Sequence, residues 1–360
     1  MNTSIYLIIN SLVLVAYFGL PVSFALGGGM HPQAQIDFVK NQIAKKQQPY
    51  YDAYLELIGY ADDALNQGHH ALEDFSVPGF YRDAEGHRNN SRSLQTDSFN
   101  AYACALAFKL NGDLKYGQKA IFFLKSWATT NKSYSDADGP LVMSYSGPGL
   151  LIAAELLKDE EIWKSTDKRQ FQEWVENVYR QACNEIRNRK NNWADWGRYG
   201  SVLSAVFLDD PDEMQENIRL IKSDLFDKIA GDGHMPEEVR RQDRGLWYTY
   251  FSLAPITAAC WAILQTEGTD LLLWEENSRS IKLALDYLLH YVKEPEAWPW
   301  HEKQRPGAPD SWPGNLMEAM EAIYDDKRYG EYVGTARPIT YTTHHFAWTF
   351  PTLMKPILTY

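Results

Sequence analysis

The sequence predicts an all-α protein in which paired helices pack around a ring. Apolar residues recur with the 3.6-residue period of helices along most of the chain, and stretches that alternate as strands do are few. Short connections rich in Gly, Pro, Asn and Asp separate these segments, at 111–113, 138–140, 209–211 and 231–233. Helices joined by short turns pack as αα-hairpins, and a ring of hairpins buries every inner face in one domain.

The helical segments follow from this period and from their boundary residues. Pro236 suits a first helical turn, where its missing N–H costs nothing, and Glu237 and Glu238 favour the positive end of the helix dipole. The pattern predicts helices at 36–47, 50–66, 94–110, 113–130, 145–158, 168–189, 197–208, 211–230, 237–266, 276–293, 315–325 and 343–358.

The amino-terminal segment has the features of a signal peptide. Residues 5–25 are almost wholly apolar and end in Ser23-Phe24-Ala25, a small-x-small cleavage pattern. We therefore expect a signal peptide over 1–25, a single domain over 26–360, and a secreted or periplasmic protein. The segment before the apolar run has no Lys or Arg, so an uncleaved membrane anchor stays open. No later segment looks apolar enough to span a bilayer, and no membrane partner is expected after signal removal.

Composition and motifs exclude several functional classes. The net charge of −12 disfavours an anionic polymer at first sight, but Arg187, Arg189, Lys190 and Arg198 form one local basic cluster, and Arg240, Arg241 and Arg244 form a second. Nothing resembles a nucleic-acid module, a phosphate loop, a paired Cys-x-x-Cys or a His-x-x-x-His metal helix. We expect no metal, no cofactor and no nucleic-acid partner. The three cysteines suggest buried apolar positions rather than a disulfide framework.

The most informative stretch is 233–253, where Arg241 and Tyr248 stand seven residues apart. On a helix from Pro236, positions 241, 244, 245 and 248 form one stripe, so Arg241 and Arg244 would lie near the Tyr248 phenol. Guanidinium groups favour the phenolate, as a tyrosine base requires. The alternative is that Tyr248 packs in the core and the arginines form a solvated face.

Two long polar segments, 76–93 and 294–314, carry further binding candidates. The first contains Tyr81, Arg82, His87, Arg88 and Arg92, and the second contains Trp298, Trp300, His301, Arg305 and Trp312. Loops on a rigid scaffold gather binding residues, and an aromatic content of 14% suits a groove in which sugar rings stack on flat side chains. The adjacent His344 and His345 are expected at the rim of such a groove.

Three stretches resemble the alginate lyase domain of polysaccharide lyase family 5 and its relatives, which include lyases of glucuronan. They are the run from Pro236 through Arg241, Tyr248 and Pro255, the Asn191-Asn192-Trp193 triplet, and the helix-hairpin sequence from Leu106 through Ala128. The resemblance implies an (α/α) toroid, an incomplete barrel of about six αα-hairpins. It also implies β-elimination without a metal on an anionic uronic-acid polysaccharide.

The resemblance assigns a role to each matching residue. Arg241 and Asn192 would hold and neutralise the uronate carboxylate, and Tyr248 would take the C5 proton and return one to the leaving O4. A single tyrosine serves both steps only when H5 and O4 share a face, which points to mannuronan or glucuronan. Trp193 stands where the family has a histidine, and His234, on its Gly-Asp-Gly turn, is the candidate to replace that histidine. The remaining substrate-binding candidates are Arg244, Trp193, Arg82, Arg88, Arg92, His301, His344 and His345.

Two other functions stay open. A glycoside hydrolase on a similar toroid would need two carboxyl groups about 5 to 9 Å apart, which Asp195, Asp232, Glu237 and Glu238 could supply. The other is a polysaccharide-binding protein without activity, which the loss of the family histidine keeps possible.

Overall fold

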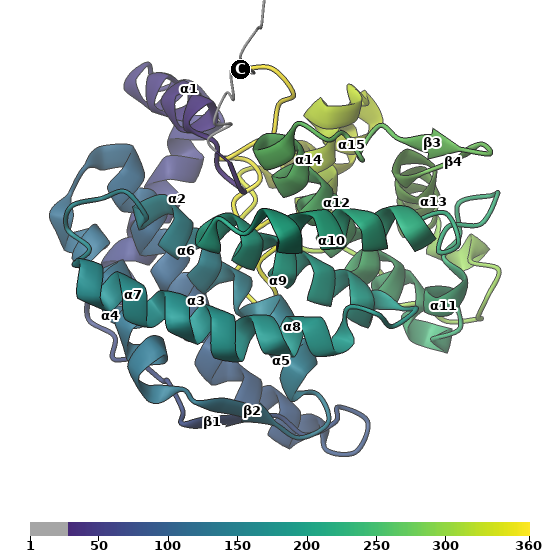
Figure 1. The fold of residues 1–360 in the computed structure, drawn as a ribbon. Coiled ribbons are helices and arrows are strands. Elements are labelled where there is room, and N and C mark those ends of the chain that lie inside the picture. Colours follow the sequence, from purple (N-terminus) through teal and green to yellow (C-terminus); the bar gives the residue numbers. More distant parts are fainter. Residues whose placement is uncertain (1–27) are drawn as a thin grey trace, which may run out of the picture.

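The computed structural model describes residues 28–360, so the predicted signal peptide lies outside the described residues. The described chain is an α/α toroid (Figure 1). Its α-helices are α1 (Gln33–Ala44), α2 (Tyr50–Leu65), α3 (Ala84–Asn111), α4 (Leu114–Thr130), α5 (Gly139–Ser146), α6 (Pro148–Leu157), α7 (Ser165–Trp174), α8 (Arg180–Ile186), α9 (Asn192–Leu208), α10 (Pro211–Asp224), α11 (Pro236–Val239), α12 (Gly245–Glu267), α13 (Ile281–Lys293), α14 (Gly314–Tyr324) and α15 (Lys327–Val333).

Strands and short helical turns make up only a small part of the described chain. Two short pairs of strands lie outside the helical layers: β1 (Asp74–Ser76) runs parallel to β2 (Ser133–Ser135), and β3 (Glu275–Glu276) runs antiparallel to β4 (Arg279–Ser280). The remaining turns are η1 (Val175–Tyr179), a π-helical turn between α7 and α8, and the 3₁₀ turns η2 (Gln242–Arg244), η3 (Pro295–Ala297) and η4 (Gly334–Ala336).

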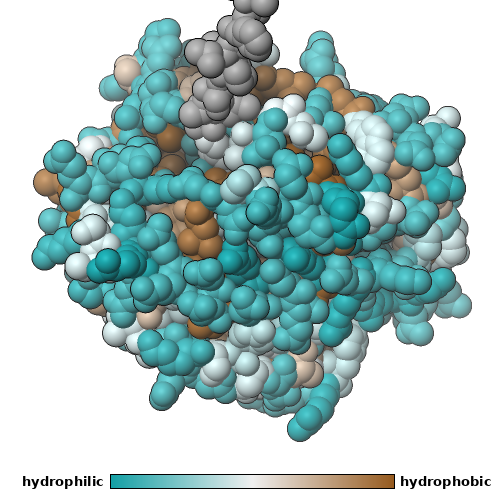
Figure 2. Space-filling model, viewed as in Figure 1, coloured by the Kyte–Doolittle hydropathy of each residue, from teal (hydrophilic) through white to brown (hydrophobic). Residues whose placement is uncertain are grey.

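An inner layer of helices forms the core. Helix α3 packs against α6, α6 against α9, and α9 against α12, while α4, α7, α8, α10 and α13 cover these helices from outside. Helix α12 is buried on every side over most of its length, as expected of a helix that is apolar all round. The face of the molecule in Figure 2 is covered mostly by hydrophilic side chains, with apolar ones confined to small gaps. The apolar residues that recur with the helical period in the sequence are therefore the ones that pack in the core.

The carboxy-terminal segment runs through the middle of the toroid without forming a helix (Figure 1). The predicted helix at 343–358 is therefore wrong. Pro351 and Pro356 remove two backbone donors from it, and His344 has a left-handed φ of +73°. The segment is held instead by inner helices: the Tyr199 hydroxyl donates to the Phe346 carbonyl at 3.1 Å, and the Trp348 indole donates to the Thr257 hydroxyl at 2.9 Å.

Two further predictions are corrected by the structure. The predicted helix 237–266 is interrupted between α11 and α12, and residues 84–93, expected in a loop, form the first turns of α3. Asp83 starts α3 because its carboxylate accepts from the Gly86 N–H at 2.8 Å. Smaller differences are the break of 145–158 at Gly147-Pro148, the later start of α13, and the unpredicted α15.

The run Gly139–Leu157 is long and apolar enough to cross a membrane by length and composition, contrary to our expectation for the chain after residue 25. However, 94% of it is buried inside the toroid, where α5 and α6 pack against α3, α8 and α9. Its apolarity is explained by this inner position. The three cysteines are also buried and unbridged, as expected.

Candidate functional site

The break between α11 and α12 places Arg241 and Arg244. Gln242 takes a left-handed φ of +56°, and the Gln304 side chain fills the break. Its amide oxygen accepts from the Leu246 N–H at 3.2 Å, and its amide nitrogen donates to the Gln242 carbonyl at 2.9 Å. The two arginines therefore stand on a turn held by a distant loop, not on the helical stripe that the sequence predicted.

Tyr248, in the first turn of α12, is the centre of the site. Its hydroxyl lies 3.0 Å from that of Tyr81, which comes from the loop before α3. The Arg241 guanidinium lies over the Tyr248 ring, 4.7 Å from its centroid. Arg244 lies 5.0 Å from the ring centroid of Phe80 and 5.4 Å from that of Tyr81. The structure thus brings together the predicted pair of Arg241 and Tyr248 and adds Tyr81, which sequence spacing could not identify as a neighbour.

Opposing effects act on the ionisation of Tyr248. Burial, followed by the hydrogen bond to Tyr81, raises the pKa of Tyr248 well above its ordinary value, whereas Arg241 and Arg244 lower it. Because burial dominates, the phenol is protonated in the free protein at neutral pH. Its reaction as a base therefore requires a route by which the proton leaves.

Five arginines on the segments that carry Tyr81 and Tyr248, and at the start of α3, have no carboxylate partner in the described chain. Within residues 28–360, no carboxylate forms an ion pair with Arg82, Arg88, Arg92, Arg241 or Arg244, whereas the neighbouring Arg240 pairs with Glu237 at 2.8 Å. Arg82, Arg88 and Arg92 are exposed, on the loop that carries Tyr81 and on the first turns of α3. Guanidinium groups without a carboxylate partner favour an anionic ligand.

Asn192, the first residue of α9, is fully buried against Glu238 of α11. Its backbone N–H donates to one carboxylate oxygen of Glu238 at 2.8 Å, and its side-chain Nδ2 donates to the other at 2.7 Å. Burial raises the pKa of Glu238 to about 7, although the two bonds from Asn192 oppose the shift. The Oδ1 atom of Asn192 is buried without a hydrogen-bond partner among the described residues. Glu238 therefore fixes Asn192 and leaves only its Oδ1 unpaired.

Trp193 is half-buried, and its ring lies under the Arg189 guanidinium at 3.8 Å. A cleft of about 410 Å³ lies beside this pair and is lined by Arg189, Lys190, Pro236 and Glu238, among others. The cleft thus shares Glu238 with the Asn192 contact. Arg189, which lies over the Trp193 ring, and Lys190 thus border a space large enough for sugar rings.

His234, the predicted replacement for the family histidine, lies among aromatic side chains and next to an acidic neighbour. The Gly233 φ of +97° turns the chain so that the His234 ring lies 4.6 Å from Trp300 and 6.2 Å from Tyr287. Its Nδ1 lies 2.6 Å from the Asp232 carboxylate. None of these partners belongs to the group around Tyr248.

The other predicted histidines fall into three environments. His301 is half-buried, with Nδ1 3.0 Å from the carbonyl oxygen of its near neighbour Lys303. His345 is wholly buried and its Nε2 lies 2.9 Å from the Tyr250 hydroxyl, so the expectation that it binds substrate at a rim is wrong. His344 lies in an aromatic group with Trp247, which touches Tyr248.

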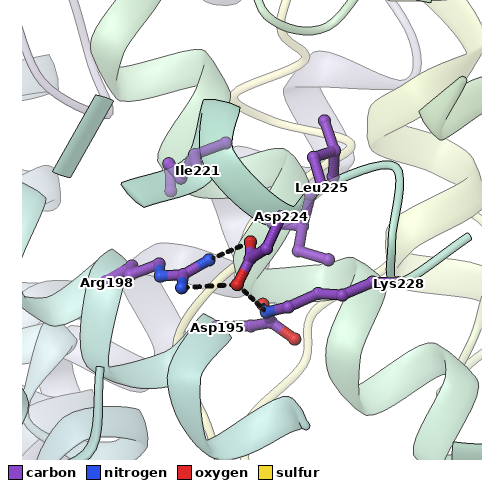
Figure 3. A pocket seen from close by; sticks show the side chains of 8 residues that line it. Asp195, Arg198, Ile221, Asp224, Leu225 and Lys228 are labelled. Atoms are coloured by element: carbon purple, nitrogen blue, oxygen red, sulfur yellow. Dashed lines mark hydrogen bonds and ion pairs between the residues drawn. The ribbon is translucent and has the colours of Figure 1, made fainter. Parts of the chain in front are cut away.

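The carboxyl groups considered for hydrolysis are held by other side chains. Asp195 is buried between Lys228 and the Ser252 hydroxyl, and Asp224 beside it binds Arg198 through both oxygens, at 2.6 and 2.8 Å (Figure 3). Glu237 pairs with Arg240 and Asp232 with His234. Among the described residues, no three His, Cys, Asp or Glu side chains group as metal ligands would.

Comparisons with known proteins agree on one family. The family model described as alginate lyase matches residues 38–298. An alginate lyase of Pseudomonas syringae pv. tomato is 24% identical over 146 residues, which are 39% of this chain and 38% of that protein. An alginate lyase of Cobetia marina is 27% identical over 126 residues, 35% of this chain and 33% of that protein. The matches thus span little more than a third of the curated relatives' length.

Solved structures share the fold over almost the whole chain. Alginate lyase A1-III in complex with a tetrasaccharide has a TM-score of 0.76 at 15% identity, covering 92% of this chain and 96% of that one. An alginate lyase from Bacteroides ovatus has a TM-score of 0.72 at 20% identity, covering 91% and 99%. At these identities the likeness establishes the toroid and nothing more.

Proposed function

Because the chain belongs to the alginate lyase family, whose model matches residues 38–298, we propose that it is a polysaccharide lyase that cleaves a uronic-acid polymer by β-elimination. The observation that carries the proposal is the half-buried Tyr248 phenol between Tyr81 and Arg241, among arginines that no carboxylate of the described chain neutralises. An anionic sugar chain supplies the missing negative charge.

In the proposed reaction, Arg241 binds the uronate carboxylate next to C5 and stabilises the negative charge that develops there. The Tyr248 phenolate takes the proton from C5, the electron pair of that bond forms the C4=C5 double bond, and the C4–O4 bond breaks. The proton held by Tyr248 passes to the leaving O4. Because one group serves both steps, H5 and O4 must share a face of the sugar, which favours mannuronan or glucuronan. No metal is required for any of these steps.

Tyr81 can carry the proton away from Tyr248, whose high pKa keeps the phenol protonated. Its hydroxyl lies 3.0 Å away, and 67% of the residue is exposed to solvent. The Tyr248 proton therefore has a hydrogen-bonded route to water before the substrate closes the site. Tyr81 acts here as a relay and not as the base.

Asn192 can assist Arg241 only after its side-chain amide is reversed, because Nδ2 is bound to Glu238. Reversal requires a proton on Glu238, which then donates to Asn192 Oδ1 and leaves Nδ2 free to donate to substrate. A pKa of about 7 makes that proton available near neutrality. We assign Asn192 this conditional role.

The predicted signal peptide supports a secreted or periplasmic location for the enzyme.

The test is ultraviolet absorbance during incubation with polymannuronate, polyguluronate and glucuronan, because only elimination forms the conjugated C4=C5 uronate. Tyr248→Phe should remove the absorbance change and retain polymer binding, with a loss of about 10²-fold or more. Tyr51→Phe is the matched control, since Lys46 packs over the Tyr51 ring, far from the Tyr248 contacts. New reducing ends without an absorbance change would show that the protein is a hydrolase. Polymer binding without any cleavage would show that it is a non-catalytic binding protein.

A further inference from the structure

The adjacent histidines His344 and His345 differ in one respect that matters for ligand binding. His345 Nε2 is paired with the Tyr250 hydroxyl, deep in the core. Neither ring nitrogen of His344 has a hydrogen-bond partner among residues 28–360, and its Nδ1 is buried. An unpaired buried polar atom destabilises a folded protein, so the lack of a partner inside the protein calls for an explanation.

The backbone of His344 is held in a conformation that few residues adopt. Its φ of +73° is left-handed, and the Ser146 hydroxyl donates to its carbonyl at 3.0 Å. Two residues later, the Phe346 N–H donates to the Tyr145 carbonyl at 3.2 Å. These bonds tie the segment to α5. Strain of this kind persists where the surrounding structure fixes a side chain in one position.

The held position sets the His344 ring in the wall of the Tyr248 site. The ring stacks on Tyr145, with centroids 4.6 Å apart and planes at 21°. It meets the edge of Trp247 at 5.5 Å, and Trp247 lies 4.8 Å from the Tyr248 ring. His344 is half-buried, so part of the residue reaches solvent beside this aromatic group.

The charge state of His344 decides what it can bind. Burial, and then the nearby His87, lowers the pKa of His344 to about 3. The imidazole is therefore neutral at any pH near 7, with one nitrogen that donates and one that accepts. A sugar hydroxyl also donates and accepts, so it matches this ring better than a carboxylate does. The aromatic side chains of Tyr145 and Trp247 favour the apolar face of a pyranose.

We propose that His344 binds a hydroxyl group of the sugar next to Tyr248, forming with Tyr145 and Trp247 one wall of the subsite where the uronan is cleaved. The proposal rests on the proposed lyase function and extends it to a residue that positions substrate. The role assigned to His344 is to position the sugar, and proton transfer stays with Tyr248.

His344→Phe is the direct test, since a phenyl ring keeps the stack on Tyr145 and loses both nitrogens. Loss of one hydrogen bond should weaken binding of a uronate tetrasaccharide about tenfold. Calorimetric titration of Tyr248→Phe, with and without His344→Phe, measures this without turnover. In the active enzyme KM should rise by a similar factor, with the pH profile unchanged. His344→Asn, which tolerates a left-handed φ and keeps a polar side chain, should recover part of the affinity.

His290→Phe is the matched control, because His290 lies on the outer helix α13 with an exposed side chain. If His344→Phe misfolds, His344→Asn takes its place, because Asn lacks the imidazole nitrogens and tolerates a left-handed φ, and its affinity should lie below that of wild type. Unchanged affinity and KM in a folded His344→Phe variant would overturn the subsite while the lyase proposal stands. If the wild type eliminates no uronan, the lyase proposal is overturned, but the titration still decides whether His344 contacts a bound sugar. If the protein binds no uronate tetrasaccharide and eliminates no uronan, both proposals are overturned.

Discussion

The hydroxyl groups of Tyr81 and Tyr248 lie 3.0 Å apart although 167 residues separate them in the chain. Tyr81 is largely exposed and Tyr248 half-buried, so the pair joins the interior of the toroid to solvent. Arg241 and Arg244 flank the pair and lower the pKa of Tyr248, whereas burial and Tyr81 raise it. The balance of these effects makes the pH profile a sensitive probe of the site.

Tyr81→Phe should move the ascending limb of the kcat/KM profile, along which the Tyr248 phenolate forms, to lower pH. The Tyr81 hydroxyl raises the pKa of Tyr248, so its removal lowers that pKa and the phenolate forms at lower pH. The rate at the plateau should fall because the proton route to solvent is interrupted. Absorbance assays across the alkaline range, with Tyr51→Phe in parallel, measure both effects. A limb that stays in place would show that Tyr81 does not control the ionisation of Tyr248.

Arg241→Ala should have the opposite effect on the same limb. Arg241 lowers the pKa of Tyr248, so its loss raises that pKa and moves the limb to higher pH. Turnover should also fall, by about 10² to 10³ in kcat, because the developing charge loses a donor. Arg240→Ala is a matched control, since Arg240 is adjacent in sequence, 69% exposed at its side chain, and paired with Glu237. Equal effects of the two substitutions would show that Arg241 acts only through its positive charge and not through a specific contact with substrate.

The sequence could predict the helices and the Arg241–Tyr248 pair, but not the reason why that pair forms. Helical spacing placed both residues on one stripe, whereas the structure interrupts the helix at Gln242 and brings Arg241 back over the ring. The interruption depends on Gln304, which is distant in sequence. Local pattern cannot reveal such a contact.

The same limit applies to His234 and His344. The turn that carries His234 was identified correctly, but its direction depends on the left-handed Gly233 and on Trp300, against which the ring packs. His344 was predicted as a binding residue within a helix, although it lies in irregular chain with a left-handed φ of +73°. Apolar residues in that chain are buried on all sides, so their period resembles that of an inner helix.

Glu238→Gln should change how stability depends on pH. Glu238 has a folded pKa of about 7 against an ordinary value of 4.5, so between these values the folded state binds more protons than the unfolded state. The wild type therefore loses stability as pH rises from about 4.5 to 7, by up to about 1.4 kcal/mol per unit, whereas the amide of the variant cannot titrate.

The measurement for Glu238 is the difference in unfolding free energy between wild type and Glu238→Gln across this pH range. The difference removes contributions common to both proteins, including that of Glu155, whose pKa burial raises to about 8. A difference that does not vary with pH would contradict the raised pKa. Activity should persist in the variant above pH 7, because the Gln amide can accept from the Asn192 N–H and donate to Asn192 Oδ1, as protonated Glu238 does.

Asp195→Asn tests whether the buried Asp195 carboxylate stabilises the fold or takes part in hydrolysis. The Asp195 and Lys228 side chains are 2% and 7% exposed and form an ion pair, and Ser252 also donates to Asp195 (Figure 3). Removing the Asp195 charge leaves buried Lys228 with only Asp224, 4.0 Å away, and loss of one partner of a buried pair costs about 3 to 5 kcal/mol. We therefore expect a large fall in the urea midpoint, with kcat of the remaining folded protein close to that of wild type. Asp232→Asn, at an exposed carboxylate beside His234, should leave both unchanged. A stable Asp195→Asn protein without turnover would instead favour the hydrolase, since it would assign that carboxyl group to the chemistry rather than to the fold.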